Sequence, residues 1–377
     1  MLFKPNTDAL GKLAAKLGLD AVVAVSPENF AYASGAFIST VRLIRPRLAF
    51  AVLPAKGEPF NIVCSIEESL TRAESWIADV RTYTEFVDVP VVVLAGELKK
   101  IGLQSGRIGI DLDYLPVSTF ETLRAAMPGA QFVNTTEDVA AIRAVKSDSE
   151  TAILEAATKQ THQATLDAMA ASKLGDSEAD MAQKIANNII NYGADGTLFM
   201  AFASGARTAH PHTVAQADVF PKPGDIIRFD VGGTYGAFAS DFARTYSAGD
   251  PTAEQRQVHA ALVKIQRETI EAVKPGILAE DLFHICRDAY GRHGLNFTMP
   301  HIGHSFGVEL HENPMLRPGD KTPIAKGMIL NIEPVVKHSS GTYHTEDLLI
   351  VTDNGFRLLT LGLAPEELPV IGRKLDY

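Results

Sequence analysis

The 377-residue sequence contains only two cysteines, Cys64 and Cys286, which lie far apart. Two distant cysteines form neither a CxxC metal motif nor a disulfide framework, so we interpret them as reduced core residues of a cytoplasmic protein. The chain also lacks long apolar runs: none approaches the roughly 18 residues of a membrane span. The first twenty residues have no continuous apolar stretch like that of a signal peptide, and they predict an amphipathic helix instead.

Positive charge is also scarce. Lysine and arginine total 35 against 45 aspartates and glutamates, a formal net charge of −10. Binding to a nucleic-acid backbone requires clustered cationic side chains, so this balance argues against a nucleic-acid partner. Low-complexity segments and short tandem repeats are absent as well. The length of the chain favours two domains, so we expect a two-domain globular protein without nucleic-acid or membrane partners.

The first part of the chain alternates short apolar runs with helical patterns, which predicts an α/β domain. A capping box, Ser147 followed three residues later by Glu150, opens a helix that continues to about residue 171. We place the domain boundary at this capping box, which gives domains of residues 1–146 and 147–377. In the first domain, strands are expected at 20–26, 47–54, 60–64 and 107–111, and helices at 66–77 and 118–127.

The second domain has further helical patterns at 177–192, 252–273 and 279–293. The last two are separated by the breaker pair Pro275–Gly276. Glycine-rich, strand-like stretches lie between and after these helices. This order predicts an α+β domain in which helices pack on a mostly antiparallel sheet.

Two distant segments of the second domain share one plan. Residues 222–245 and 325–352 each have a glycine turn, a short apolar strand, an acidic residue, a loop and a second acidic residue. Since side chains alternate between the faces of a strand, the apolar residues leave the first acid on the opposite face, together with Arg228 in the first segment. The acids are Asp230 and Asp241 in the first segment and Glu333 and Glu346 in the second.

The turns "GGTYG" and "SSGTY" would fold each segment into a hairpin, with its two acids on neighbouring strands. Two such hairpins side by side would bring four carboxylates together on one sheet face. Carboxylates in a half-buried cluster repel one another and cannot all ionise without compensation. We therefore expect bound cations at this cluster.

Histidines are concentrated near the two hairpins. "MPHIGHSFGVELHENPML", which lies between them, carries His301, His304 and His311, and "ASGARTAHPH" adds His210 and His212 before the first hairpin. Imidazole suits transition metals, whereas carboxylates suit harder ions such as Mn²⁺. One imidazole with four carboxylates indicates two adjacent first-row ions, which at about 3.5–4 Å can activate a shared water.

The histidine-rich segment also contains "GHSFG", residues 303–307, which matches the G-x-S-x-G nucleophile elbow. That elbow requires a helix after the serine, but the residues between Gly307 and Pro314 are too few for a helix of normal length. A Ser305 nucleophile would also leave the four acids unexplained. "HENP" lacks the second histidine of the zinc motif H-E-x-x-H. The pattern therefore favours a metal-dependent enzyme over a serine hydrolase.

Taken together, these motifs resemble the pita-bread family, which contains aminopeptidase P, prolidase, methionine aminopeptidase and creatinase. They occur in the family's order and cover the second half of the chain. The first half is similar in length and pattern to the amino-terminal domain of the creatinase and prolidase branch. The resemblance implies a curved, mostly antiparallel sheet in the catalytic domain, and a homodimer. The matching motifs are "SGARTAHPH", "PGDIIRFDVGG", "SDFART", "GHSFGVELHENP", "GMILNIEP" and "HTEDLLIVTDNG".

The resemblance also implies a site for two divalent metal ions, with Mn expected and Co, Zn or Fe as alternatives. Asp230 would bind one ion, and His304 with Glu333 the other, while Asp241 and Glu346 would bridge the two. Glu333 would in addition handle a proton, and so act as a catalytic residue.

His212 and His311 match the family's histidines that contact the scissile amide and its tetrahedral intermediate, so we expect both to be catalytic. Two positions depart from the proline-specific members. His344 stands where they carry an arginine, two residues before the last ligand, and Pro300 stands where they tend to have a histidine, with His301 one place further on. Since both positions help to recognise the substrate in the family, we expect His301 and His344 to contact it.

We therefore predict a dinuclear metal-dependent hydrolase that cleaves an amide bond near the amino terminus of a small peptide, foremost an Xaa-Pro aminopeptidase or dipeptidase. An enzyme on the same fold that acts on a small non-peptide molecule, such as a creatine-like amidine, is an alternative that the missing arginine favours. A non-enzymatic binding protein is a third class. Loss of a metal ligand would have indicated it, and none is lost.

Overall fold

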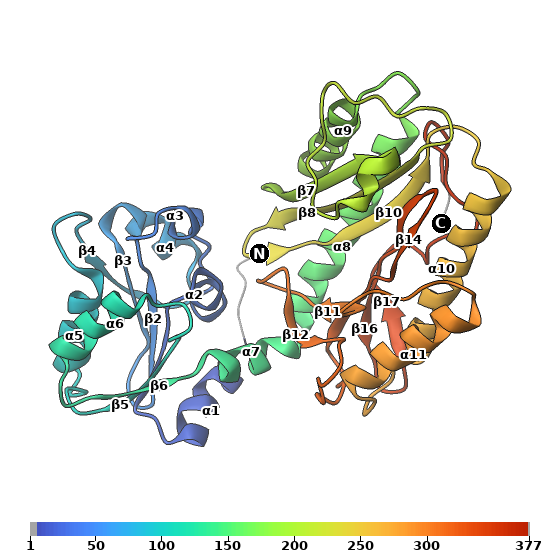
Figure 1. Cartoon of the computed structure of the whole chain (residues 1–377). Helices are drawn as coiled ribbons and strands as arrows, with labels where there is room; N and C mark the ends of the chain where they lie inside the picture. The colour runs from blue at the N-terminus through green and yellow to red at the C-terminus, as the bar shows by residue number, and fades with distance from the viewer. Residues whose placement is uncertain (1–5, 376–377) are drawn as a thin grey trace. The chain divides into compact units, whose positions relative to one another are not determined.

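The structure, a computed structural model, describes residues 6–375. The chain divides into two compact units, Met1–Arg143 and Ala144–Tyr377 (Figure 1). The amphipathic helix expected at the start of the chain is α1 (Thr7–Leu17), and residues 1–5 of that expectation lie outside the described residues.

The first unit contains one six-stranded mixed sheet, in the order β4-β3-β2-β1-β5-β6. Its centre is the antiparallel β1–β2 pair, and β1 pairs in parallel with β5 on its other side. All four residues of β1 are buried, as expected for a strand covered on both faces. The strands are β1 (Ala21–Ala24), β2 (Phe50–Pro54), β3 (Phe60–Cys64), β4 (Asp79–Tyr83), β5 (Arg107–Ile110) and β6 (Gln131–Asn134). The predicted α/β class of this half is confirmed.

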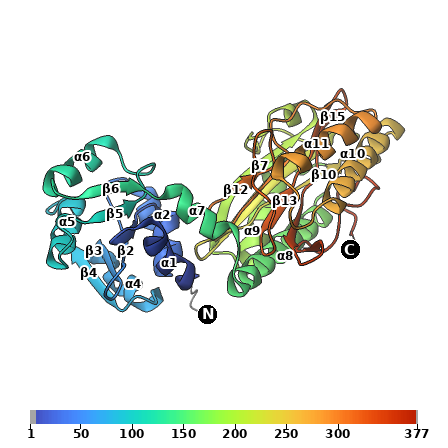
Figure 2. The same cartoon turned by 90° about the horizontal axis from the view of Figure 1, so that it is seen from below.

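Helices surround this sheet, and two of them, α5 and α6, lie side by side (Figure 2). Leu94 of α5 and Leu123 of α6 are fully buried in one core with Phe50 and Ile108 of the sheet. The helix expected at 66–77 is shorter, because a 3₁₀ turn precedes it and it ends at Glu74. The helices after α1 are α2 (Pro27–Ser34), α3 (Ser39–Leu43), η1 (Ser65–Glu67), α4 (Glu68–Glu74), α5 (Pro90–Lys100), α6 (Val117–Ala126) and α7 (Thr136–Ala144).

The second unit is built of two successive blocks, each with two helices followed by strands. The first block comprises α8 (Asp148–Ala170), α9 (Glu178–Asn191), β7 (Gly196–Ser204), η2 (Gly205–Ala209), β8 (Ile226–Tyr235), β9 (Phe238–Ala239) and β10 (Phe242–Ser247). The second comprises α10 (Ala253–Glu271), α11 (Ala279–Arg292), β11 (Gly303–Ser305), β12 (Glu312–Met315), β13 (Ile329–Ile332), β14 (Val335–His338), β15 (Gly341–His344), β16 (Asp347–Val351) and β17 (Phe356–Leu358).

The named strands of the second unit all pair antiparallel. They form the sheets β10-β8-β7, with β9 on β8, then β12-β11-β13-β16-β17, and the ribbon β14-β15. Helices α10 and α11 share one apolar core with β13 and β16. The predicted α+β catalytic domain with antiparallel sheets is thereby confirmed. Across residues 6–375, no helix combines the length and apolar character needed to cross a membrane.

Capping boxes begin three of the long helices of this unit. In α8, the Ser147 hydroxyl accepts from the Glu150 backbone N–H, and the Glu150 carboxylate accepts from the Ser147 N–H. Ser177 and Thr252 start α9 and α10 in the same way. These reciprocal bonds satisfy backbone donors that a helix start leaves unpaired, which explains why the helix starts were readable in the sequence.

The two predicted hairpins are present, but the turn of the first is shifted. Gly232 and Gly233 lie inside β8, and the turn comes at Gly236, which has the left-handed φ of 59°. A side chain at Gly232 would meet the Ser240 carbonyl oxygen at 2.2 Å, so this glycine serves close strand packing rather than a turn.

Candidate active site

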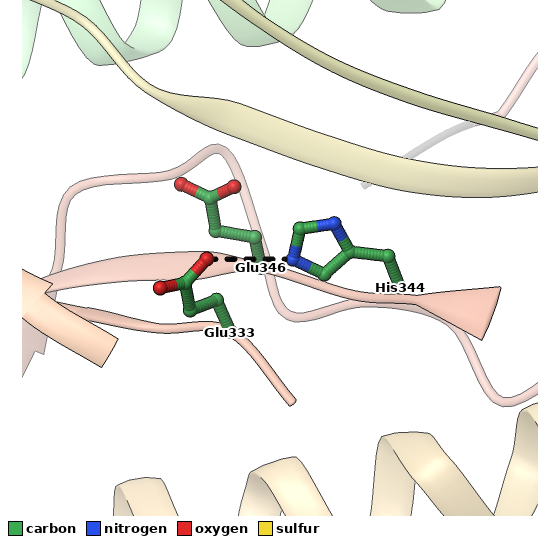
Figure 3. A group of neighbouring side chains, drawn as sticks. All are labelled: Glu333, His344 and Glu346. Carbon is green, nitrogen blue, oxygen red and sulfur yellow. Dashed lines mark ion pairs between the residues drawn. The ribbon is translucent and has the colours of Figure 1, made fainter. Parts of the chain in front are cut away.

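The four acidic residues come from the two hairpins, and three of them lie where a strand is interrupted. Asp241 precedes β10, Glu333 follows β13, and Glu346 precedes β16, whereas Asp230 lies within β8. Oxygens of Asp230, Asp241 and Glu346 all lie within 4.8 Å of one another. A second group, within the same limit, joins Glu333 and Glu346 to a ring nitrogen of His344 (Figure 3). The structure thus brings together the four acids that the sequence singled out.

Buried contacts between the hairpins hold this arrangement. The Thr245 hydroxyl accepts from the His344 backbone N–H at 2.8 Å and donates to the His344 carbonyl oxygen at 2.9 Å. The Arg244 guanidinium, 1% exposed, donates to the Glu346 carbonyl oxygen and to the Asp347 carboxylate. Arg244 and Thr245 are neighbours in β10. Thr245 binds the end of β15 and Arg244 binds the start of β16, so the backbone on either side of Glu346 is fixed.

The electrostatics of the acidic cluster require a compensating charge. Burial first, then repulsion by Asp230, raises the pKa of Glu333 to about 8. Burial and neighbouring carboxylates also raise the pKa of Asp241 and Glu346 well above their ordinary values, and burial raises that of Asp230. Both Glu346 carboxylate oxygens and Glu333 Oε1 are buried, with no hydrogen-bond partner among the described residues. A buried polar atom is costly unless it is paired, and carboxylate oxygens are ligands for divalent cations. These donors therefore fit a metal site.

His304 presents a ring nitrogen to the same cluster. Its Nε2 lies 3.5 Å from Glu333 Oε1 and 3.6 Å from Asp241 Oδ2. Its Nδ1 lies 2.9 Å from the Ser305 carbonyl oxygen, which can only accept, so Nδ1 carries the hydrogen and Nε2 presents its lone pair to the acids. Burial, with His311 adding, lowers the pKa of His304 to about 3. A neutral imidazole oriented by a backbone carbonyl is the form in which histidine binds metals.

The segment after His304 is held by a buried ion pair. Lys146 Nζ lies 2.6 Å from Glu312 Oε2 and 3.5 Å from the Ser305 hydroxyl, and both charged side chains are 1% exposed. Ser305 ends β11, and the chain continues without a helix to β12, which begins at Glu312. This is not the strand–serine–helix geometry of a nucleophile elbow, in agreement with the sequence argument against a serine hydrolase.

Three further histidines surround the acids. The ring of His311 lies 4.0 Å from that of His304, centroid to centroid, and His301 Nδ1 lies 3.5 Å from Glu333 Oε1. Burial lowers the pKa of His311, and the charge of His212 lowers it further, so these two side chains are neighbours. Both His212 and His311 are exposed and can be reached by a substrate.

His344 is buried, at 1% exposure, and its neighbour is Arg228. The sequence argument did not weigh Arg228 as functional, although its side chain reaches this site. Strand alternation had placed it on the same face as Asp230, and the structure puts its Nη2 3.5 Å from Asp230 Oδ2. That alternation was the available signal.

Comparison with known proteins identifies the family of both parts of the chain. Residues 152–353 match the metallopeptidase family M24, and residues 7–145 match the creatinase/prolidase N-terminal domain. An Xaa-Pro dipeptidase of Pyrococcus horikoshii is 29% identical over 349 residues, which cover 92% of this chain and 93% of the relative.

Solved structures agree over almost the whole chain. The dipeptidase PepE of Mycobacterium ulcerans superimposes with a TM-score of 0.82 at 29% identity, covering 96% of each chain. A prolidase of Pyrococcus furiosus does so with a TM-score of 0.80 at 26% identity, covering 93% of this chain and 98% of its own. The resemblance inferred from the motifs is confirmed, and the chain belongs to metallopeptidase family M24, with a creatinase/prolidase-type domain at its amino terminus.

Proposed function

We propose that this protein is a metallopeptidase that hydrolyses short Xaa-Pro peptides, as an Xaa-Pro dipeptidase or aminopeptidase. The observation that carries the proposal is the cluster in which buried, unpaired carboxylate oxygens of Glu333 and Glu346 meet the lone pair of His304. The relatives named above, which cover nearly the whole chain, include an Xaa-Pro dipeptidase and a prolidase.

Two divalent ions are proposed for this cluster, with Mn²⁺ foremost and Co²⁺, Zn²⁺ or Fe²⁺ as alternatives. Asp230 would hold one ion, and His304 with Glu333 the other, while Asp241 and Glu346 would serve both. The grouping of Asp230, Asp241 and Glu346 within 4.8 Å supports this division. When bound, such a pair of ions supplies Lewis acidity and lowers the pKa of a water that the ions share.

The side chains around the cluster can transfer protons, stabilise negative charge and contact the substrate. Glu333, whose Oε1 lies 3.5 Å from His304 Nε2, can accept a proton from the attacking water and deliver it to the leaving amine. His212 and His311, exposed and adjacent, can donate hydrogen bonds to the carbonyl oxygen as negative charge develops on it. His301, beside Glu333 and partly exposed, is placed to contact the substrate.

A substrate panel tests the proposal. Metal-free protein is reconstituted with Mn²⁺, Co²⁺, Zn²⁺ or Fe²⁺ and assayed on Xaa-Pro dipeptides, matched Xaa-Ala dipeptides, Xaa-Pro tripeptides and amidino acids. We expect cleavage of the Xaa-Pro peptides above the Xaa-Ala controls, and the tripeptides separate an aminopeptidase from a dipeptidase. Turnover of an amidino acid without peptide cleavage would replace the proposal by the creatine-like alternative.

The assembly expected from the family resemblance is a homodimer of a cytoplasmic protein, and we keep both as proposals. Both cysteines are free and buried, as a reduced protein requires. Size-exclusion chromatography with light scattering should give the mass of two chains at micromolar concentration. A single-chain mass at every concentration would contradict the dimer.

A further inference from the structure

Arg228 lies beneath the acidic cluster with its side chain only 6% exposed. Each of its three guanidinium nitrogens faces an acceptor. Nη1 donates to the Pro211 carbonyl oxygen at 2.8 Å, and Nη2 lies 3.5 Å from Asp230 Oδ2. Nε and Nη2 both approach Nδ1 of His344, at 3.4 and 3.2 Å. The guanidinium is therefore occupied by the protein itself.

These contacts determine which nitrogen of His344 carries hydrogen. A guanidinium has only donors, so Nδ1 of His344 must act as the acceptor and carry no hydrogen. In the neutral ring the hydrogen then resides on Nε2, which faces Glu333 Oε2 at 3.5 Å (Figure 3) and makes no hydrogen bond to any of the described residues. The Thr245 hydroxyl bonds both the backbone N–H and the carbonyl of His344, and so fixes the backbone from which the ring projects.

We propose that Arg228 and His344 form a positioning relay: Arg228 fixes the tautomer of His344, and His344 directs its Nε2–H at the carboxylate of Glu333. The relay holds the Glu333 carboxylate in the orientation needed for metal binding and proton transfer. Neither relay residue binds the substrate. This gives His344 a role other than the substrate contact expected from the sequence. The relay rests on the proposed function for its kinetic consequences but not for its effect on metal binding.

Arg228 extends the same relay to the loop that carries His212. Its bond to the Pro211 carbonyl anchors this loop one residue before the histidine. The Thr208 hydroxyl, in η2 just before this loop, accepts from the Thr342 backbone N–H at 3.0 Å and links η2 to β15. Loss of Arg228 would therefore disturb Glu333 and His212 together, which predicts a fall in kcat for every substrate.

A pair of His344 variants tests the tautomer directly. The amide nitrogen of glutamine reaches the place of Nε2, whereas that of asparagine reaches only the place of Nδ1. His344→Gln should keep the Mn²⁺ affinity of the metal-free protein within a few-fold, and His344→Asn should lose about 10–100-fold, as is typical when a partner of a ligand is removed. Mn²⁺ titration calorimetry measures this without any assay of turnover. Equal affinities for the two variants would overturn the relay.

A second arm separates positioning from substrate binding. Three proteins are assayed on an Xaa-Pro dipeptide and on its carboxyl-terminal amide: wild type, Arg228→Met and the control Arg292→Met. Arg292 is an exposed arginine of α11 that pairs with Glu268. The relay predicts that Arg228→Met weakens Mn²⁺ binding and lowers kcat alike for both substrates. A raised KM for the dipeptide alone, with Mn²⁺ affinity unchanged, would show that Arg228 binds the substrate carboxylate and would overturn the relay. If wild type cleaves neither peptide, the proposed function fails, while the affinities of the His344 variants still decide on the relay.

Discussion

Glu333 illustrates why this cluster exists at all. It follows β13, a strand buried throughout, and its nearest ionisable neighbours include Asp230, which has the same charge. An uncompensated buried carboxylate costs several kcal/mol, so such a residue persists only where a cation or a proton neutralises it. Its contacts with His301, His304 and His344 place three imidazoles around one carboxylate. This environment supports the proposed role of Glu333 as a metal ligand over that of a structural acid.

Replacing Glu333 by glutamine removes the charge while keeping the shape. We expect activity to fall by at least about 10²–10⁴-fold, the range that a general acid–base contributes, with additional loss of metal affinity. Circular dichroism should be unchanged, and Asp353→Asn, at an exposed ion pair with Lys326, serves as a control that leaves activity intact. Near wild-type turnover and metal content in Glu333→Gln would show that Glu333 is only structural.

At this scale the sequence allowed part of the site to be predicted. Strand alternation correctly put Asp230 beside Arg228, and the shared plan of two segments indicated that four acids would meet. The sequence did not predict the contact between Arg228 and His344, which are 116 residues apart. That pairing depends on how the two hairpins approach through side chains such as Thr245, and no local pattern encodes that approach.

Among the elements, β11 matters most for the site, since it carries His304 between β12 and β13. Its first residue, Gly303, has a φ of 153°, and a side chain there would meet the Asn331 carbonyl oxygen at 1.9 Å. Strand β11 can pair this closely with β13 because the residue before the ligand histidine has no Cβ. The position of His304 relative to Glu333 depends on that contact.

Gly303→Ala should therefore displace β11 and lower both metal affinity and stability. We expect destabilisation of about 1–3 kcal/mol, the usual cost of forcing an extra group into a packed site. Gly291→Ala is the matched control, because this glycine lies in α11 with nothing within 4 Å of an added Cβ. There the change should be neutral or stabilising by up to about 1 kcal/mol. Urea unfolding and Mn²⁺ titration of both variants check this, and equal behaviour of the two would contradict it.

Capping boxes were the clearest signals for helices, although α6 and α11, which have no side-chain cap, were also placed to within one residue. The helices α8, α9 and α10 start at capping boxes, and each was placed to within a few residues. Helix α5 starts at Pro90 and continues with three valines, which favour strands, so only its packing on the sheet decides that it is helical. Strand β4 is mostly polar and β6 is half polar, and both exist because they extend a sheet whose centre is apolar.

On the scale of the whole molecule, buried histidines link the stability of the fold to pH. His259 of α10 is 1% exposed, and its Nε2 lies 3.0 Å from the Pro365 carbonyl oxygen. Burial, with Arg244 adding, lowers its pKa to about 4. A depressed pKa means that the folded state binds fewer protons, so this contribution to stability is present above pH 6.5 and is lost as pH falls towards 4. A drop from 6.5 to about 4 corresponds to about 3 kcal/mol.

His259→Gln cannot be protonated, so it should lose this pH dependence. We expect the free energy of unfolding of wild type to fall by up to about 3 kcal/mol more than that of the variant between pH 6.5 and pH 4. Urea unfolding across this range, with both proteins free of metal, gives the comparison. A stability difference that is the same at every pH would contradict the neutral, buried state of His259.

The order of helices and hairpins along the whole chain predicted the architecture of the second unit. The sequence showed that helices and hairpins occur twice in succession after residue 147, and the structure has that order in α8 to β10 and again in α10 to β17. Within each block, the strands that flank the acids pair antiparallel, β8 with β10 and β13 with β16.

Stepwise metal loading is the most direct test of the central claim that two divalent ions at the Asp230–Glu346 cluster enable Xaa-Pro hydrolysis. Metal-free protein is titrated with Mn²⁺, and kcat/KM for an Xaa-Pro dipeptide is measured at each step together with bound metal. We predict no turnover without metal and a plateau at two equivalents per chain. Full activity of the metal-free protein, or binding of no metal at any concentration, would contradict the claim.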